Sequence, residues 1–347
     1  MDSLPAHYGK IIFRMNSSIE TGAITPPRLF PSLKAGFDAV ASHISLILFP
    51  IALDALLWLG QHLSMKAWLT PILESYFKFS SVTGSAELKE FLTASQASLM
   101  TFSENFNLFS FLRTYPLGIP SLISSIQPAE SPFGLAPVIN FNSSLASFGV
   151  MLLLSLIGIL LGAQYFYLVA RVANRETDHV SFKVLLSILW QVLSFTLVFY
   201  LVAALVSLPV LMITSVLIMI SPDLGVLVMI ALVFIAAWIS LPLIFSAHGI
   251  FTYRQPFRVS LANSIRLGRY AGPQIATFAV VILIMVTGLN YLWSIPEAND
   301  WLLSVGIAGH AFVSTALLAG SFIYYHSAMR WVQEIIQHRL SAQKPAE

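Results

Sequence analysis

Long apolar runs separated by short polar segments make up most of the chain. Six of these runs cover residues 39–59, 145–170, 189–220, 224–251, 273–293 and 302–329. A helix of about 20 mainly apolar residues crosses the hydrocarbon layer of a bilayer, which is ~30 Å thick. The pattern therefore predicts an all-α integral membrane protein whose six transmembrane helices form three hairpins.

The run from 184 to 251 contains Asp223 as its only acid and has no base. As a single helix it would extend for roughly 100 Å, so the chain must turn within it. The residues 221–225, Ser-Pro-Asp-Leu-Gly, favour a turn, because proline fixes φ, aspartate bonds back to the backbone and glycine tolerates positive φ. Pro209 is interpreted as a kink within one span. An additional crossing in 184–251 would place the basic loop that follows, with Arg254, Arg258, Arg266 and Arg269, on the outer side.

The basic residues predict the orientation. With the N-terminus inside, segments 1–38, 171–183, 252–271 and 330–347 are cytoplasmic and hold 14 of the 18 Lys and Arg residues. Loops on the cytoplasmic side of membrane proteins carry an excess of these residues. We therefore expect both termini in the cytoplasm and the chain in the plasma membrane of a bacterium.

The expected organisation has five parts. They are an N-terminal and interfacial segment (1–38), the first span (39–60), an outer helical and Pro-rich insertion (61–143), a five-span bundle (144–329) and a cytoplasmic tail (330–347). Two apolar stripes at helical spacing predict two helices in the insertion, which lie on the membrane face or the bundle, or pack on each other. Five prolines between 116 and 137 indicate an irregular cap or a docking surface.

Composition excludes several classes of protein. Apolar residues make up 57% of the chain and charged residues 10%, against about 25% charged residues in soluble domains. The chain has no cysteine, which excludes thiolate metal sites and disulfides, and its net charge of +2 does not indicate binding to nucleic acid. No phosphate-binding loop, nucleophile elbow or dinucleotide motif is present. We therefore expect no cofactor and no enzymatic activity.

Few ionisable residues fall inside the predicted spans, where such groups are costly and often functional. Asp54 and His310 lie near the outer ends of the first and sixth spans. If these spans are neighbours, the two residues form a carboxylate–imidazole pair that can relay a proton. In the alternative, Asp54 reaches water at the interface and His310 bonds a backbone carbonyl.

Four arginines, Arg254, Arg258, Arg266 and Arg269, lie in one cytoplasmic segment. Arg254 and Arg258 are four residues apart and are expected on one helix face. The group either binds a lipid phosphate or an acidic partner, or serves only to fix topology. On the second span, Gly158 and Gly162 fit the small-xxx-small pattern of close helix contact.

Histidines are grouped at the cytoplasmic ends of the spans. If His43, His248 and His326 converged with Asp38, they could bind a metal ion. None of the tight ligand spacings of known metal motifs occurs, so interfacial histidines without a metal are expected instead.

A short amphipathic segment precedes each predicted hairpin, and two of these segments are alike: Ser32-Leu33-Lys34-Ala35 and Val259-Ser260-Leu261-Ala262. The repeated layout resembles uncharacterised bacterial six-span membrane proteins, including the membrane region attached to some glycerophosphodiester phosphodiesterases. The resemblance implies the hairpin layout alone. The chain has no phosphodiesterase domain, so no activity or site residue follows from it.

These observations favour a non-catalytic scaffold or accessory subunit of a membrane assembly. Its expected partners are the lipid bilayer, other membrane subunits, and anionic lipid headgroups at the cytoplasmic face. The alternative is a transporter or channel, proton-coupled through Asp54 and His310. A third class, a lipid-modifying enzyme, would use the cytoplasmic arginines to hold a headgroup.

Overall fold

The computed structural model describes residues 26–64, 66–81, 86–141, 143–177, 181–240 and 243–342. Within these residues, four helices are long and apolar enough to cross a membrane. They are α7 (Ser144–Ala173), α8 (Phe182–Ile220), α11 (Phe257–Trp293) and α12 (Leu303–Ala342). The chain is therefore an all-α protein with several membrane-length helices, as the apolar pattern predicts.

The first predicted span is a broken helix and not a straight one. Helix α2 (Leu29–Ser42) is followed by the 3-10 helix η1 (Ile44–Ile47) and α3 (Leu48–Leu59), and the two halves are bent by 92°. His43 between them has non-helical angles, φ −134° and ψ 56°. The halves have different partners: α2 packs closely on α12, while α3 also contacts the insertion. Counting this bent pair as one span gives up to five candidates.

The fourth predicted span, 224–251, does not form one helix. Helix α9 (Pro222–Ser240) is followed by turns at 243–247 and by the short helix α10 (His248–Thr252). The apolar part of α9, Pro222–Trp238, is shorter than the other candidates. Pro242, outside the described residues, lacks the N–H that a continuing helix requires.

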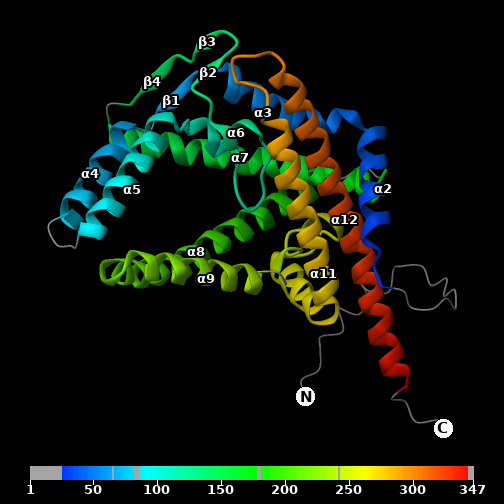
Figure 1. Ribbon diagram of the computed structural model, residues 1–347. Helices are drawn as coiled ribbons and strands as arrows, with labels where there is room; N and C mark the ends of the chain where they lie inside the picture. Colours follow the sequence, from blue (N-terminus) through cyan, green and yellow to red (C-terminus); the bar gives the residue numbers. More distant parts are fainter. Residues whose placement is uncertain are drawn as a thin grey trace.

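Helices α8 and α9 form a hairpin that turns at Ser221 (Figure 1). Helix α8 contacts α7, α10 and α11, and α9 contacts α5. Helix α8 continues through Pro209 without a break. Most apolar side chains of the hairpin are exposed, including Leu201 at 67% and Trp238 at 73%. A helix that is apolar all round requires lipid or another protein around it.

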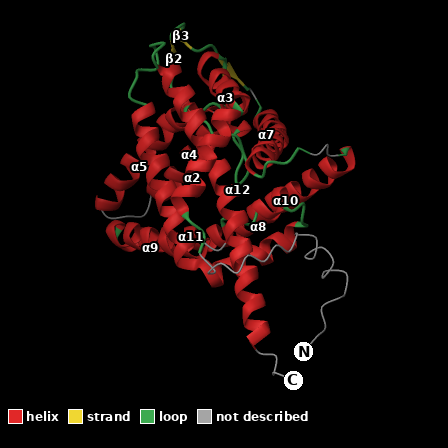
Figure 2. Cartoon of the chain, turned by 90° about the vertical axis from the view of Figure 1, so that its right-hand side faces the viewer, coloured by secondary structure: helices red, strands yellow, loops and turns green. Residues whose placement is uncertain are grey.

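The helices do not form one parallel bundle. In Figure 1, α2, α11 and α12 run down the view, whereas α7, α8 and α9 run across it. Helix α12 is at the centre, as Figure 2 also shows, and contacts α2, α3, α7, α10 and α11. Gly36 of α2 permits one of these contacts, because a Cβ atom there would lie 2.4 Å from the backbone nitrogen of Gly320.

The insertion between the first span and α7 contains two helices and small strands. Helices α4 (Lys66–Ser81) and α5 (Ala86–Asn105) pack against each other, and η2 (Leu108–Leu112) and α6 (Ile123–Ile126) follow. Strand β1 (His62–Ser64) pairs in parallel with β4 (Val138–Asn140), which joins the two ends of the insertion. Strands β2 (Glu130–Ser131) and β3 (Gly134–Leu135) form an antiparallel hairpin, which precedes β4 in the sequence. On α5, Leu99 and Phe102 remain 40% and 46% exposed, so the apolar stripe is not buried along its whole length.

Candidate functional site

Asp54 on α3 is fully buried, and hydrogen bonds to the insertion engage its carboxylate. The Ser121 hydroxyl donates to Oδ1. The backbone N–H of Leu122 donates to Oδ2 at 3.0 Å, and that of Ile123 donates to Oδ1 at 3.1 Å. These donors lie where α6 begins, and a carboxylate is favourable beside the free N–H groups of a helix start. We call Asp54, Ser121, Leu122 and Ile123 the Asp54 latch, because they tie the insertion to the first span.

His310 on α12 lies beside the latch. Its Nδ1 is 4.0 Å from Asp54 Oδ2, and its Nε2 is 3.2 Å from the hydroxyl oxygen of Ser314. Both Asp54 and His310 are buried. The structure thus brings Asp54 and His310 together, at a distance longer than a hydrogen bond. The alternative position of Asp54, exposed to water at the interface, is not found.

Arg113 also holds the loop that contains Ser121. Its Nη1 donates to the Ser121 carbonyl at 3.2 Å and to the hydroxyls of Ser124 and Ser125 at 2.8 and 3.0 Å. Its guanidinium carbon also lies 5.4 Å from the centre of the Tyr115 ring. Nothing in the sequence analysis above singles out Arg113. The cluster of serines eight to twelve residues after it was the signal that could have indicated this role.

Gly158 and Gly162 of α7 pack against the insertion and not against another span. A Cβ atom at Gly158 would lie 2.5 Å from the Leu112 carbonyl oxygen, and one at Gly162 would lie 2.9 Å from Gly118 Cα. The small-xxx-small pattern therefore allows close contact between α7 and an irregular segment, residues 112–118, and not between two spans. In Figure 1 the loop between η2 and α6 extends below α7 on the side of α8.

A cavity of about 240 Å³ lies next to Arg113. Its walls come from the end of α5, from η2 and the following loop, and from α7 and α8. The lining residues are Phe106, Ser110, Phe111, Arg113, Thr114, Tyr115, Ser124, Gln127, Ser155 and Tyr200. The cavity is thus cationic at one point, hydroxyl-rich around it and aromatic on its walls.

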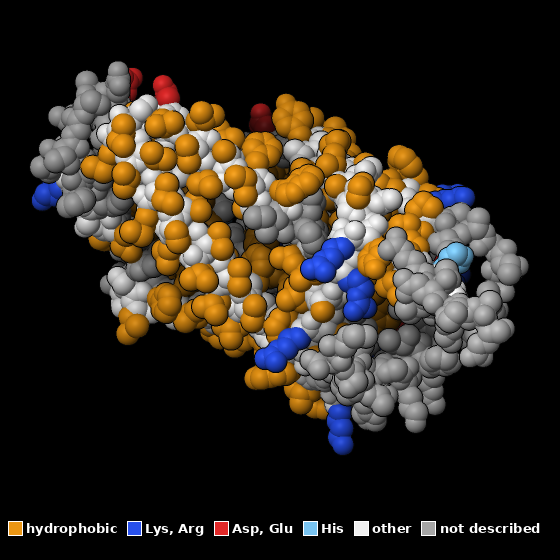
Figure 3. All heavy atoms as spheres, turned by 90° about the horizontal axis from the view of Figure 1, so that it is seen from below, with side chains coloured by type: hydrophobic (Ala, Val, Ile, Leu, Met, Phe, Trp, Pro, Cys, Tyr) orange, Lys and Arg blue, Asp and Glu red, His pale blue; other side chains and the backbone are white. Residues whose placement is uncertain are grey.

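The four arginines of segment 254–269 are distributed over two elements. Arg254 lies in the loop before α11 with φ 53° and forms an ion pair at 3.0 Å with Glu176. It does not share a helix face with Arg258, because α11 begins only at Phe257. Arg258, Arg266 and Arg269 are exposed on α11. Seen from below, Lys and Arg side chains gather beside a broad apolar surface (Figure 3).

The remaining histidines have separate partners. The Nδ1 of His43 is 3.1 Å from the Ala39 carbonyl oxygen, and the Nε2 of His248 is 2.8 Å from the hydroxyl of Ser321. His326 Nδ1 is 3.3 Å from the Tyr253 hydroxyl, and burial raises the pKa of Tyr253 to about 12. Within the described part of the chain, no group of three His, Cys, Asp or Glu side chains is arranged to hold a metal ion.

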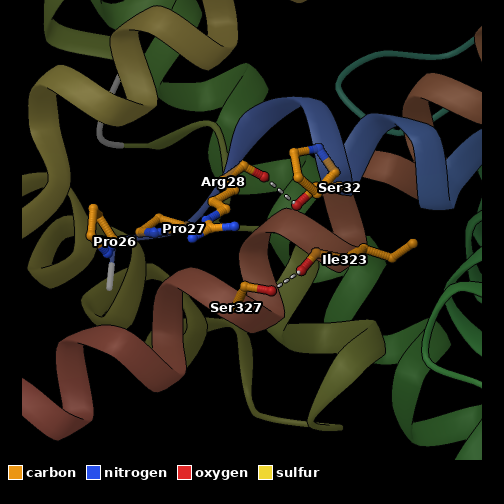
Figure 4. A pocket seen from close by; sticks show the side chains of 7 residues that line it. Pro26, Pro27, Arg28, Ser32, Ile323 and Ser327 are labelled. Atoms are coloured by element: carbon orange, nitrogen blue, oxygen red, sulfur yellow. Dashed lines mark hydrogen bonds between the residues drawn. The ribbon is translucent and has the colours of Figure 1, made fainter. Parts of the chain in front are cut away.

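A second cavity of about 320 Å³ lies where α2 begins beside α12. Figure 4 shows that the hydroxyls of Ser32 and Ser327 point to backbone carbonyls of their own helices, those of Arg28 and Ile323. Both hydroxyls therefore donate within their helices. Arg28 supplies the charged group among the lining residues.

The chain matches no family model, no curated protein and no solved structure.

Proposed function

We propose that the chain is a non-catalytic accessory subunit or scaffold of a membrane assembly, which holds the insertion, residues 61–143, in a fixed position on its membrane helices. In this proposal the chain crosses a bacterial plasma membrane six times with both termini in the cytoplasm. The first crossing is bent at His43, and α9 forms the short fourth crossing. The Asp54 latch is the observation that carries the proposal.

The chemistry of the latch supports a positioning role. A buried carboxylate is costly unless hydrogen bonds and charges compensate for the lost hydration. Asp54 has three donors, and all three come from residues 121–123 of the insertion. Removing the carboxylate leaves those three donors unpaired inside the protein. Removing a carboxylate that faces solvent would leave no buried donor unpaired.

The exposed α8–α9 hairpin also supports a subunit role. Its apolar side chains are exposed along most of both helices, including Leu197 at 71% and Phe234 at 72%. Large apolar surfaces of this kind contact lipid or another membrane protein. We propose that the hairpin provides part of the contact with other subunits.

The test compares Asp54→Asn with Asp223→Asn, which changes an exposed acid in the α8–α9 turn. An Asn amide directs N–H groups toward the donors of the latch, so amide hydrogen exchange of residues 121–126 in nanodiscs should accelerate by about tenfold or more. Copurification of partner subunits in mild detergent should fall in parallel. Asp223→Asn should change neither measurement.

Unchanged exchange in Asp54→Asn would contradict the positioning role. A chain that is monomeric in mild detergent, with no reproducible partner for the unaltered protein, would contradict the subunit role.

The 4.0 Å approach of His310 to Asp54 favours a second candidate, a proton-coupled transporter or channel. Here a proton passes from the Asp54 carboxyl group to His310 Nδ1, with Ser314 beside Nε2. His310→Gln separates the two candidates, because it removes the titratable ring and leaves the three donors to Asp54 in place. Transport predicts that His310→Gln abolishes proton flux into vesicles. The scaffold predicts that the variant retains slow exchange at 121–126 and normal copurification.

A further inference from the structure

We propose that the cavity beside Arg113 binds an amphiphile that has an anionic headgroup, a phosphate or a carboxylate, on an acyl chain. The headgroup contacts Arg113, and the chain lies along the exposed faces of α7 and α8. This binding site goes beyond the proposed scaffold function and does not depend on it.

Arg113 provides the charge that selects an anion. Its Nη1 already donates to Ser121, Ser124 and Ser125, and these acceptors are all neutral. Among the residues that the structure describes, Arg113 has no carboxylate within ion-pair distance. The guanidinium is a planar group of five donors that suits phosphate and carboxylate oxygens. The hydrogen bonds of Nη1 already fix the position of the guanidinium. Binding a ligand with the remaining N–H donors therefore costs little further side-chain entropy.

Neutral groups around Arg113 add further donors. The Ser110 hydroxyl lines the cavity, and its oxygen is buried without a hydrogen-bond partner in the described part of the chain. Buried hydroxyls normally have a partner. Tyr200 and Ser124 line the same cavity and bring two more hydroxyls to it. An oxyanion can therefore accept bonds from several directions.

The walls of the cavity indicate that the rest of the ligand is apolar. Phe106 and Phe111 both line the cavity, and their rings pack edge to face with centres 5.6 Å apart. On the membrane side, Ser155 and Tyr200 are flanked by exposed leucines of the same helices. These are Leu152 at 52%, Leu156 at 47%, Leu197 at 71% and Leu201 at 67%.

The size of the cavity indicates that only the headgroup of the ligand lies inside it. Sites for whole drug-sized molecules measure about 300–1,000 Å³, and this cavity of about 240 Å³ is smaller. It accommodates a headgroup but not an acyl chain as well. The chain must leave the cavity, and the leucines on α7 and α8 provide the apolar surface for it.

The experiment measures binding to the full chain in detergent by tryptophan fluorescence. The probes are lysophosphatidate, oleate, inorganic phosphate and uncharged monoolein. We expect saturable binding of lysophosphatidate, of oleate or of both, with monoolein at least about tenfold weaker. Comparing the first two probes shows whether phosphate or carboxylate is preferred. Equal binding of monoolein, or binding of inorganic phosphate as tight as that of the amphiphiles, would overturn the proposal.

Two variants locate the site. Arg113→Gln should weaken binding of the anionic probe about tenfold or more, whereas Arg269→Gln, an exposed arginine on α11, should not. Arg113 also holds the serine loop, so loss of binding in Arg113→Gln could follow from a disturbed loop.

Ser155→Phe fills the cavity from α7 and leaves Arg113 and the Asp54 latch unchanged. It should abolish saturable binding, while Ser207→Phe on the exposed face of α8 should bind normally. Normal binding by Ser155→Phe would place the ligand elsewhere.

Discussion

At the scale of single residues, burial decides which ionisable groups influence the fold. Asp54 and Arg254 are both paired, but Asp54 is fully buried and the Arg254 side chain is 40% exposed. Exposed ion pairs contribute about 0–1 kcal/mol, because water and salt screen them. The sequence indicated that Asp54 and His310 were unusual, since a charge inside an apolar run is costly. It did not indicate the partners of Asp54, because residues 121–123 are almost 70 positions away.

His62 at the start of the insertion gives a prediction about pH. Burial lowers the pKa of His62, so the folded chain favours the neutral ring. The resulting stabilisation is present above the ordinary pKa of about 6.5 and is lost as the pH falls below it. Between pH 8 and pH 5, the Tm of His62→Gln should therefore fall less than that of the unaltered chain. Thermal unfolding in detergent at the two pH values measures this difference, and equal decreases would contradict it.

At the scale of elements, apolar periodicity located the long helices but not their interruptions. Helix α7 matches its apolar run closely, whereas α11 begins at Phe257, before its run starts at 273, and α12 continues past 329 to Ala342. The hairpin turn falls at Ser221, at the start of the predicted Ser221–Gly225 segment. The break at His43 has no comparable signal, because residues 39–59 are apolar throughout apart from a few polar positions. It depends on α2 and α3 packing against different neighbours, which is information that a local pattern does not contain.

The contact between α7 and the insertion gives a prediction at this scale. Gly158→Ala places a Cβ atom 2.5 Å from the Leu112 carbonyl oxygen, so α7 and η2 must separate. Overpacking of this kind costs about 1–3 kcal/mol, and the Tm should fall by several degrees. Gly149→Ala is the matched control on the same helix, because its Cβ atom would have no neighbour within 4 Å. Equal Tm values for the two variants would show that the close contact does not form.

At the scale of the whole molecule, charge and hydropathy specify a membrane protein, whereas the arrangement of the helices depends on packing. The expected layout of six spans in three hairpins leaves the angles between helices open, and in Figure 1 α2, α11 and α12 cross α7, α8 and α9. Hydropathy does not distinguish a helix that faces lipid from one that faces another helix, because both surroundings are apolar. The central position of α12 was for this reason not predictable from its composition.

The distribution of basic residues gives a prediction about topology. Reporters fused after Glu347 and inserted at Glu176 should both be active in the cytoplasm, and one inserted at Ala298 should be exported. Paired alkaline phosphatase and fluorescent protein fusions measure each position. An exported reporter at Glu347 would contradict the predicted orientation, and a chain that stays soluble without detergent would contradict the membrane class itself.

The amino-acid sequence alone determined the helical membrane class, the turn between α8 and α9, and the two ionisable residues that merit attention. These properties depend on local composition and on the cost of a charge in an apolar environment. Only the tertiary structure decided that His310 lies beside Asp54, that Arg113 and Asp54 both hold the loop at 121–125, and that the glycines of α7 contact the segment 112–118 before it. Each of these contacts joins segments that are distant in the chain, so it depends on how complete helices pack and not on any local pattern.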